Sequence, residues 1–422
     1  MYPAALVALV LLLLRPAEAT ANNGLKEEAW KPLCRLSEEL DELPNELLDD
    51  AQSIFSKALN LKREALRTQI FVTAEPDDPE ARALSALAAI LGANANNMVQ
   101  ALTNRGISSQ IDAAKQVGYI KERVDEWLAL ASQVKSSAHA CLVTTSDNIA
   151  PVVQSSTIGG EPCKLQSAKT IAKQRLSKTH VTTAFPNIKH PGMAGSDQQS
   201  GAKTCKLFSD RPANGLHAQD AATGVSYIDG AITVETGAGQ PAKITDLSDE
   251  AKIAAASGDA WKKLNRALKA RVKADGADFK NESAEMDTDG ITRKILSTAN
   301  TGRQPRLEAQ LSGIRDSLFT ATPKDKVHKF MVKVSTYKLK AEIAGKSKDA
   351  ILGDITDTTD LHSILATMQT AAAVERAELK AQLKAALAIK DALNDDSCKD
   401  KGDNQEKCNG EKQCSWYSNM TE

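Results

Sequence analysis

Cysteine is the residue type whose placement says most about the chemistry of this sequence. The chain has seven cysteines, and none stands in a C-x-x-C pair of the kind that zinc sites use. Disulfide bonds are therefore the expected chemistry, and they require an oxidising compartment. The cysteines are Cys34, Cys141, Cys163, Cys205, Cys398, Cys408 and Cys414.

Other patterns that could carry chemistry are weaker. Residues 237–242 (GAGQPA) fit a dinucleotide-loop string, but no βαβ unit surrounds them, so we interpret them as a surface turn. Residues 287–290 (DTDG) resemble the start of a calcium loop, but the glycine comes two positions early. The six histidines are scattered, and no serine or cysteine lies in a nucleophile context such as G-x-S-x-G. We expect no enzyme, no cofactor and no metal site.

Two sequons, Asn281-Glu282-Ser283 and Asn419-Met420-Thr421, stand in polar, turn-like segments. In a secreted chain Asn281 and Asn419 are predicted N-glycan acceptors. Secretion is itself predicted by residues 1–19, where an apolar run of about thirteen residues ends in Ala17-Glu18-Ala19. That run is too short to span a bilayer, so we interpret it as a signal peptide.

The elements that position these residues are helical. Apolar residues recur at alternating steps of three and four, which indicates helix rather than strand. Residues 75–79 (EPDDP) interrupt the pattern with prolines and aspartates that stop one helix and cap the next. We predict a long antiparallel hairpin over residues 25–137, with arms of roughly 70 Å forming a coiled-coil rod. The predicted seams are Leu33, Leu36, Leu40, Leu43, Leu47, Ala51, Ile54, Ala58, Leu61 and Ala65, then Leu84, Leu87, Leu91, Met98, Leu102, Ile107, Ile111, Ala114, Val117, Ile120, Val124, Trp127, Ala131 and Val134.

The hairpin restricts the disulfide pairing. With its turn near Asp77, Cys34 lies level with about Ile120, and Cys141 lies about 30 Å farther along. A disulfide tolerates only about 7 Å between Cα atoms, so Cys34–Cys141 is excluded. Two pairings remain: Cys34–Cys163 with Cys141–Cys205, or Cys34–Cys205 with Cys141–Cys163. Each attaches a loop region to the end of the hairpin opposite the turn.

That loop region, residues 142–249, is rich in Ser, Thr, Gly, Asn and Pro. We predict a head with a few short strands, such as residues 231–235, and little apolar core of its own. A lower helical part follows over residues 250–393, with one helix over 249–273 and a last long helix over 361–393. Composition changes near Asn394, where residues 394–422 are predicted to be a linker and the start of a small second domain.

The net charge of −1 gives no general attraction for nucleic acid. The basic run at residues 262–271 has helical apolar spacing, so it is interpreted as a solvated helix face. Leu48, Phe55, Leu59 and Leu66 lie off the first seam, where a second copy of the chain could bury them. We therefore predict a homodimer.

Three stretches resemble one known family. Residues 30–41 (WKPLCRLSEELD) and 157–166 (TIGGEPCKLQ) are similar to segments of the class A amino-terminal domain of trypanosome variant surface glycoproteins. Residues 408–416 (CNGEKQCSW) resemble the small cysteine-rich carboxy-terminal domains of the same proteins. The resemblance implies a mainly α fold with residues 20–393 as the amino-terminal domain. It also implies the pairing Cys34–Cys163 with Cys141–Cys205.

The resemblance further implies a dimeric coat glycoprotein on the cell surface, held in the outer leaflet of the plasma membrane by a glycosylphosphatidylinositol (GPI) anchor. Such a coat shields invariant proteins and evades host antibodies by antigenic variation. The alternative is a receptor or serum-resistance protein derived from the same scaffold. Because three tail cysteines are an odd number, we expect the protein to continue beyond Glu422 with a fourth cysteine and an anchor signal.

Overall fold

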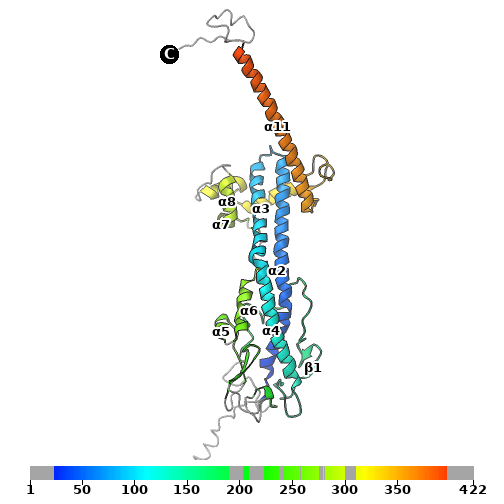
Figure 1. Ribbon diagram of the computed structural model, residues 1–422, viewed down its shortest axis with the longest axis vertical. Helices are drawn as coiled ribbons and strands as arrows, with labels where there is room; N and C mark the ends of the chain where they lie inside the picture. The colour runs from blue at the N-terminus through cyan, green and yellow to red at the C-terminus, as the bar shows by residue number, and fades with distance from the viewer. Residues whose placement is uncertain are drawn as a thin grey trace, which may run out of the picture. The chain divides into compact units, whose positions relative to one another are not determined.

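The computed structural model describes residues 23–189, 203–208, 223–236, 242–256, 258–274, 279, 281–299 and 310–396 (Figure 1). The described residues divide into two units. The first contains the chain up to Ala58 and from Asn97 to Asp278, and the second contains Leu59–Asn96 and the chain from Phe279 onward. The predicted signal peptide, Cys398, Cys408, Cys414 and Asn419 lie outside the described residues.

The predicted helical hairpin is confirmed. Helix α2 (Glu27–Ala74) ends at the EPDDP break, where the Asp78 carboxylate accepts the Glu80 N–H at 2.8 Å. The second arm consists of α3 (Ala81–Ala101), a π-helical turn η1 (Leu102–Gly106) and α4 (Ile107–Gln133). Within each unit the two arms pack together through buried Leu, Ile, Val and Ala side chains.

The π-turn overturns part of the predicted seam. Ile107 and Ile111 are 51% and 63% exposed, whereas Gln110 and Ala113 are buried instead. A π-turn contains one residue more than an α-turn, and each added residue rotates the following side chains by about 100°. The predicted seam took a step of five residues from Leu102 to Ile107, whereas the buried positions are Gly106 and Gln110, so the two isoleucines lie beside the seam. The seam is regained at Val117, Ile120 and Val124, which are buried as predicted.

Of the residues predicted to face a second copy of the chain, some are exposed and others are buried. Leu48 and Phe55 are 37% and 49% exposed, as that prediction requires. Leu66 is only 6% exposed and Leu59 is half-buried, so Leu66 is already covered by its own chain. The prediction was wrong for Leu66 because lying off a two-helix seam does not expose a side chain that other segments cover.

The region after the hairpin carries two three-stranded antiparallel sheets. In the first, β1 (Val153–Gln154) pairs with β2 (Thr157–Ile158), which pairs with β3 (Glu161–Pro162). In the second, β4 (Val225–Tyr227) pairs with β5 (Ile232–Val234), which pairs with β6 (Ala242–Ile244). A 3-10 turn, η2 (Lys206–Phe208), lies between the sheets in sequence. The predicted short strands are confirmed.

The region was predicted to have little apolar core, but it contributes many buried apolar side chains to a core that it shares with the hairpin. Phe185, Phe208 and Ile232 are completely buried in the same core cluster as the hairpin side chains. Phe208 contacts Trp127 of α4 with ring centroids 6.3 Å apart. These apolar residues are isolated in the sequence, so no periodic pattern reveals them. Tertiary contacts alone bring them together.

Residues 249–273 form two helices, α5 (Glu250–Ala255) and α6 (Asp259–Ala270), rather than one. Gly258 separates them where a Cβ atom would lie 1.8 Å from the Asp229 carbonyl oxygen, so only glycine allows that approach. Helix α6 buries Trp261, Leu264 and Leu268 and packs against α4 (Figure 1), with the Trp261 ring edge-on to Phe185 at 4.8 Å between centroids. This packing groups residues 250–278 with the first unit rather than with residues 279–393.

The second unit encloses the turn of the hairpin. Its helices are α7 (Ser283–Thr288), α8 (Gly290–Ala299), α9 (Leu311–Phe319), α10 (Pro323–Ser335), a 3-10 turn η4 (Leu352–Asp354) and α11 (Thr358–Asp396). Lys333 of α10 forms ion pairs of 2.7 and 2.9 Å with Asp78 and Glu80. The Tyr337 hydroxyl donates to Glu75 at 2.8 Å. The acidic turn is thus held by basic and phenolic groups.

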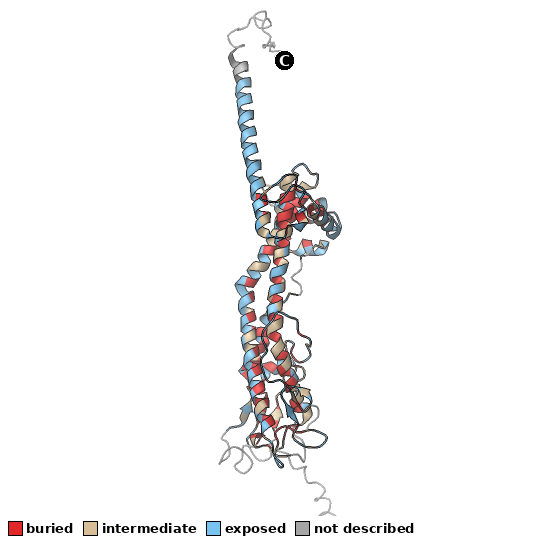
Figure 2. Ribbon diagram, turned by 90° about the vertical axis from the view of Figure 1, so that its right-hand side faces the viewer, coloured by how far each residue is buried: buried red, intermediate tan, exposed pale blue. Residues whose placement is uncertain are grey.

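Among the described side chains of α11, the buried ones lie near its start, at Leu361, Ile364 and Leu365. Leu379 and Leu383 are 56% and 60% exposed. Figure 2 shows most of the helix after its start in pale blue, the colour of exposed residues. Among the described residues, no helix combines the length and apolar character needed to cross a membrane.

Candidate functional site: the acidic face of the first helix

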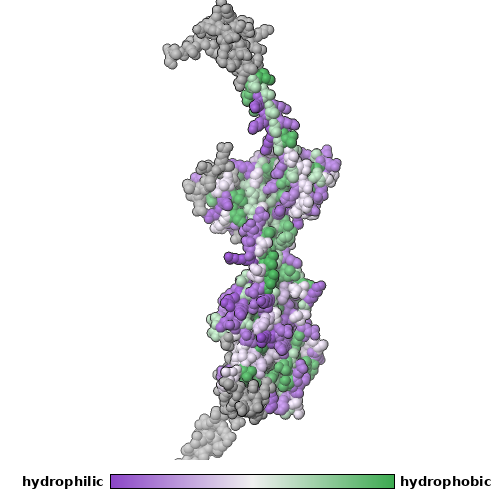
Figure 3. Space-filling view, in the orientation of Figure 1, coloured by the Kyte–Doolittle hydropathy of each residue, from purple (hydrophilic) through white to green (hydrophobic). Residues whose placement is uncertain are grey.

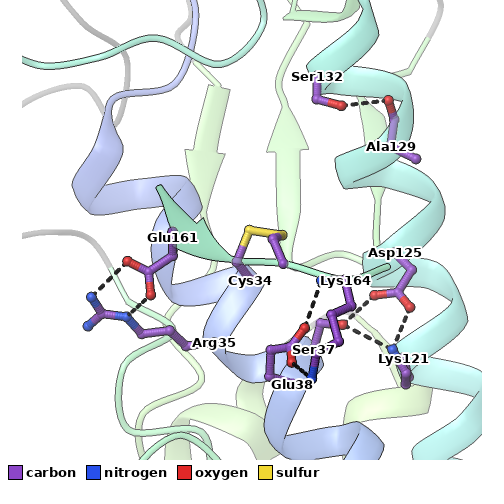
Figure 4. The surroundings of a disulfide bond; sticks show 11 residues. Cys34, Arg35, Ser37, Glu38, Lys121, Asp125, Ala129, Ser132, Glu161 and Lys164 are labelled. Atoms are coloured by element: carbon purple, nitrogen blue, oxygen red, sulfur yellow. Dashed lines mark hydrogen bonds and ion pairs between the residues drawn. A yellow bond between two sulfur atoms is a disulfide. The ribbon is translucent and has the colours of Figure 1, made fainter. Parts of the chain in front are cut away.

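Two disulfides join the loop region to the hairpin. Cys34 of α2 pairs with Cys163, which directly follows β3, with Cα atoms 4.9 Å apart (Figure 4). Cys141 pairs with Cys205, with Cα atoms 4.6 Å apart. The structure therefore has the pairing that the family resemblance implied, and it lacks the Cys34–Cys141 bond that hairpin geometry excluded.

Ion pairs flank the first disulfide on both sides (Figure 4). The Arg35 guanidinium donates to both oxygens of Glu161 at 2.6 and 3.0 Å, and this hydrogen bonding raises the pKa of Arg35. Glu38 accepts the backbone N–H of Lys164 at 2.7 Å and pairs with its ammonium group at 2.8 Å. The hydrogen bond that the ammonium group donates to Glu38 raises the pKa of Lys164. Because these groups are partly exposed, their main effect is to orient the chain that leaves Cys163.

A buried polar cluster fixes the two arms against each other (Figure 4). Lys121 of α4 binds Asp125 at 2.6 Å and donates to the Ser37 hydroxyl of α2 at 3.2 Å. Ser37 in turn donates to Asp125. Buried charges are tolerated only when they are paired and hydrogen-bonded. A shift of either arm by one helical step would separate Ser37 of α2 from Lys121 and Asp125 of α4.

Residues 164–181, which we call the strap, lie along α2 without regular secondary structure. Its backbone N–H groups donate to side chains of α2 rather than to another strand. The acceptors recur every three or four residues, so they occupy one face of the helix. The bonds run from Lys164 to Glu38, Ala168 to Asp41, Ile171 to Asn45, Leu176 to Glu42, and from Thr179, His180 and Val181 to Glu39.

Glu39 makes the most of these contacts. Besides three backbone N–H groups, its carboxylate accepts the Ser177 hydroxyl at 2.6 Å and lies 3.2 Å from Nδ1 of His180. Burial by itself would raise the pKa of Glu39. Hydrogen bonds from His180, Ser177 and the backbone outweigh burial and hold the pKa far below the ordinary value of 4.5. Glu39 is therefore a buried, ionised anchor for the end of the strap.

Glu46, two turns farther along α2, collects three cations. It accepts from Arg175, from Lys178 at 3.0 Å and from Arg271 at 3.2 Å. Burial alone would raise the pKa of Glu46, but hydrogen bonds from Arg175 and Lys178 and the charge of Arg271 lower it. This arrangement was not predicted from the sequence. The pattern that could have revealed it is a run of acidic and amide side chains opposite the leucine seam: Glu38, Glu39, Asp41, Glu42, Asn45, Glu46 and Asp49.

Comparison with known proteins identifies the family that uses this architecture. Residues 6–369 match the family described as Trypanosome variant surface glycoprotein (A-type). The chain belongs to this family. The match covers most of the sequence, including both disulfides, the strap and the start of α11.

Relatives and a solved structure agree with the assignment. Variant surface glycoprotein MITAT 1.1 of Trypanosoma brucei brucei is 26% identical over 96% of this chain and 82% of its own length. Variant surface glycoprotein MITAT 1.2 of the same organism is 29% identical over 88% of this chain and 79% of its own length. The solved structure of MITat 1.1 has a TM-score of 0.76 at 25% identity, over 86% of this chain and 100% of that chain.

In this variant surface glycoprotein the predicted sequon at Asn281 lies in the second unit. Asn281 is half-exposed and lies two residues before the start of α7. The Ser283 hydroxyl of the sequon donates to the Ala321 carbonyl at 3.0 Å. The four described cysteines, Cys34, Cys141, Cys163 and Cys205, all belong to the first unit. The described part of the glycoprotein contains no group of His, Cys, Asp and Glu side chains suited to a metal ion.

Proposed function

We propose that this protein is a GPI-anchored coat glycoprotein of a trypanosome, located on the outer leaflet of the plasma membrane. It shields invariant surface proteins, and changes in its exposed loops allow escape from host antibodies. The observation that carries the proposal is the match of residues 6–369 to the A-type variant surface glycoprotein family.

The strap supports this function physically. Many of its contacts to α2 use backbone N–H groups, which every residue except proline possesses, and side chains such as Arg175 and Ser177 add to them. Ile171 and Leu176 are 52% and 81% exposed, so their side chains add little to the attachment. An acidic helix face can therefore hold straps of many sequences. This tolerance is what a protein with a fixed fold and a variable surface requires.

Enzymatic release from living cells tests the anchor. Cells that express the full-length protein are treated with a phosphatidylinositol-specific phospholipase C, and the surface and supernatant are probed by antibody. We expect the protein to move to the supernatant, while a control protein with a transmembrane helix stays on the cells. Retention of both proteins would contradict GPI anchoring, and a low surface copy number would contradict the coat.

We also propose that the protein forms a homodimer through the hairpin. Four exposed apolar residues come from the middle of the arms in the first unit: Leu48, Phe55, Ile107 and Ile111. In Figure 3 apolar surface gathers over part of the hairpin helices. Burying each such side chain stabilises an interface by about 1.5–3 kcal/mol. A second copy of the same helices would cover these side chains symmetrically.

Sedimentation of the purified chain at micromolar concentration tests the dimer. Ile111→Asp should weaken dimerisation by about tenfold or more, because an unpaired carboxylate would be buried in the interface. Val332→Asp is the matched control, since Val332 is 47% exposed on α10 of the second unit. A monomeric wild-type protein would reject the dimer. A normal dimer for Ile111→Asp would reject this interface.

Asn281 is proposed to carry an N-glycan, because its sequon is half-exposed in a turn of a family of glycoproteins. Treatment with a peptide N-glycosidase should lower the apparent mass of the wild-type protein. The same treatment should lower the apparent mass of the variant Asn281→Gln by less, because the glycan at this site is missing. Equal shifts for both proteins would show that Asn281 is unmodified.

A further inference from the structure

A hollow of about 270 Å³ lies in the first unit between α2, the strap and the end of α6. Its volume is near the lower limit of ligand pockets, about 300 Å³, so only a small ligand would fit. Its lining is mainly polar rather than aromatic. The charged lining residues are Glu46, Asp50, Arg175, Lys178, Arg271 and Lys273.

The charges around the hollow do not balance. Four cationic side chains face two carboxylates, which leaves an excess of two positive charges in the lining. Glu39 lies 3.6 Å from Arg175 behind the lining, and it reduces the excess without removing it. Glu46 is already shared among three cations, so it cannot neutralise each of them.

Arg271 provides a second, independent observation. Its side chain is 9% exposed, and one terminal nitrogen binds Glu46 at 3.2 Å. The other terminal nitrogen, Nη1, is buried and has no hydrogen-bond partner among the described residues. Buried guanidinium groups are normally satisfied, because an unpaired donor loses its hydration without compensation. This donor therefore indicates that a partner is missing at the hollow.

We propose that this hollow binds a small dianionic oxyanion, a phosphate or sulfate group. The lining carries net positive charge even after Glu39 is counted, and the several oxygens of an oxyanion accept from a guanidinium group and ammonium groups at the same time. Arg271 Nη1 supplies the buried donor, and Arg175 contributes positive charge. Lys273, which is exposed and has no partner among the described residues, closes the rim. An anion-binding site of this kind would add a ligand-binding activity to the proposed structural role in the coat.

Calorimetric titration of the purified full chain with sodium phosphate, sodium sulfate and sodium acetate at constant ionic strength tests the proposal. We expect saturable binding of phosphate and sulfate below about 10 mM and much weaker binding of acetate, which carries one charge. Lys273→Gln should weaken phosphate binding by about fivefold. Arg271→Gln should weaken it by about tenfold or more, since it removes a charge-assisted donor.

Arg266→Gln is the matched control, because Arg266 is exposed on α6, close in sequence to Arg271 and Lys273, but does not line the hollow. It should leave phosphate affinity unchanged. Equal weakening by Arg266→Gln and Lys273→Gln would overturn the site in favour of diffuse charge attraction. Absence of saturable phosphate and sulfate binding to the wild-type protein, or equal affinity for acetate, would also overturn it. Lys273→Gln keeps the test decisive if Arg271→Gln does not fold.

Discussion

Replacing Glu39 by glutamine tests whether the carboxylate of this residue anchors the strap. The change preserves the shape of the side chain and removes its charge. In the wild-type protein one carboxylate oxygen accepts the N–H groups of His180 and Val181 at 3.0 and 2.8 Å. The other oxygen accepts the Ser177 hydroxyl and the Thr179 N–H. Glutamine retains only one of these two acceptors.

The expected destabilisation follows from the donors left without a partner. If the amide nitrogen replaces the oxygen facing Val181, the Val181 N–H meets another donor and the His180 N–H keeps only its bond to the other oxygen. The opposite orientation affects Ser177 and Thr179. Each buried donor that loses its acceptor destabilises the fold by about 1–3 kcal/mol. Arg175 also loses part of the negative charge 3.6 Å away. We expect Glu39→Gln to lower the free energy of unfolding by about 4 kcal/mol.

Urea unfolding followed by tryptophan fluorescence measures this loss, and hydrogen exchange locates it at residues 177–181. Glu42→Gln is the matched control, because Glu42 accepts only one exposed backbone N–H of the strap, from Leu176 at 3.0 Å. The control should lower stability by less than about 1 kcal/mol. If the two variants lose equal stability, or if exchange at residues 177–181 is unchanged, Glu39 is not the anchor.

Three further predictions concern the same unit. As the pH falls below about 4.5, the ordinary pKa of glutamate, the wild-type protein should lose more stability than Glu39→Gln. The reason is that the pKa of Glu39 in the folded state lies below its value in the unfolded state, so the stabilisation by this carboxylate is lost when it is protonated. Urea titrations at several pH values measure the difference. Replacing Cys141 and Cys205 by alanine removes a disulfide between residues 64 apart in the sequence and should lower the free energy of unfolding by about 2–4 kcal/mol. Residues 142–249 should still unfold together with the hairpin, because they share its core. Loss of hydrogen-exchange protection in residues 142–249 before the hairpin would contradict this. Lys121→Met should destabilise the fold by about 3–5 kcal/mol, because it leaves the buried Asp125 carboxylate without its cation and with only the Ser37 hydroxyl bound. Adding Asp125→Leu should restore part of the loss; a double variant no more stable than the single variant, in the same urea assay, would refute the buried-pair argument.

The helical hairpin could be predicted because its signals are local. Residues three and four apart in a helix are neighbours, so Leu33, Leu36 and Leu40 define a buried face without knowledge of any partner. The EPDDP break likewise carries its own turn chemistry, and the structure ends α2 directly before it. The prediction failed at Ile107 and Ile111, where the predicted seam took a step of five residues across the π-turn.

The candidate site was less visible, because its partners are distant in sequence. Glu39 and Val181 are 142 residues apart, and Glu46 and Arg271 are 225 residues apart. The acidic run on α2 reads as an ordinary solvated helix face until the strap lies on it. The N–H groups that it binds belong to the backbone, so no residue type in the strap marks them.

The sequence by itself determined the helical arms, the position of the turn, the short strands and the use of cysteine for disulfides. The tertiary structure decided which cysteines pair, which isoleucines face outward and how one helix face holds an irregular segment. It also decided that isolated apolar residues of 142–249 join the hairpin core. The division has one physical reason: periodicity encodes contacts between near neighbours on one element, whereas contacts between elements depend on how the whole chain packs.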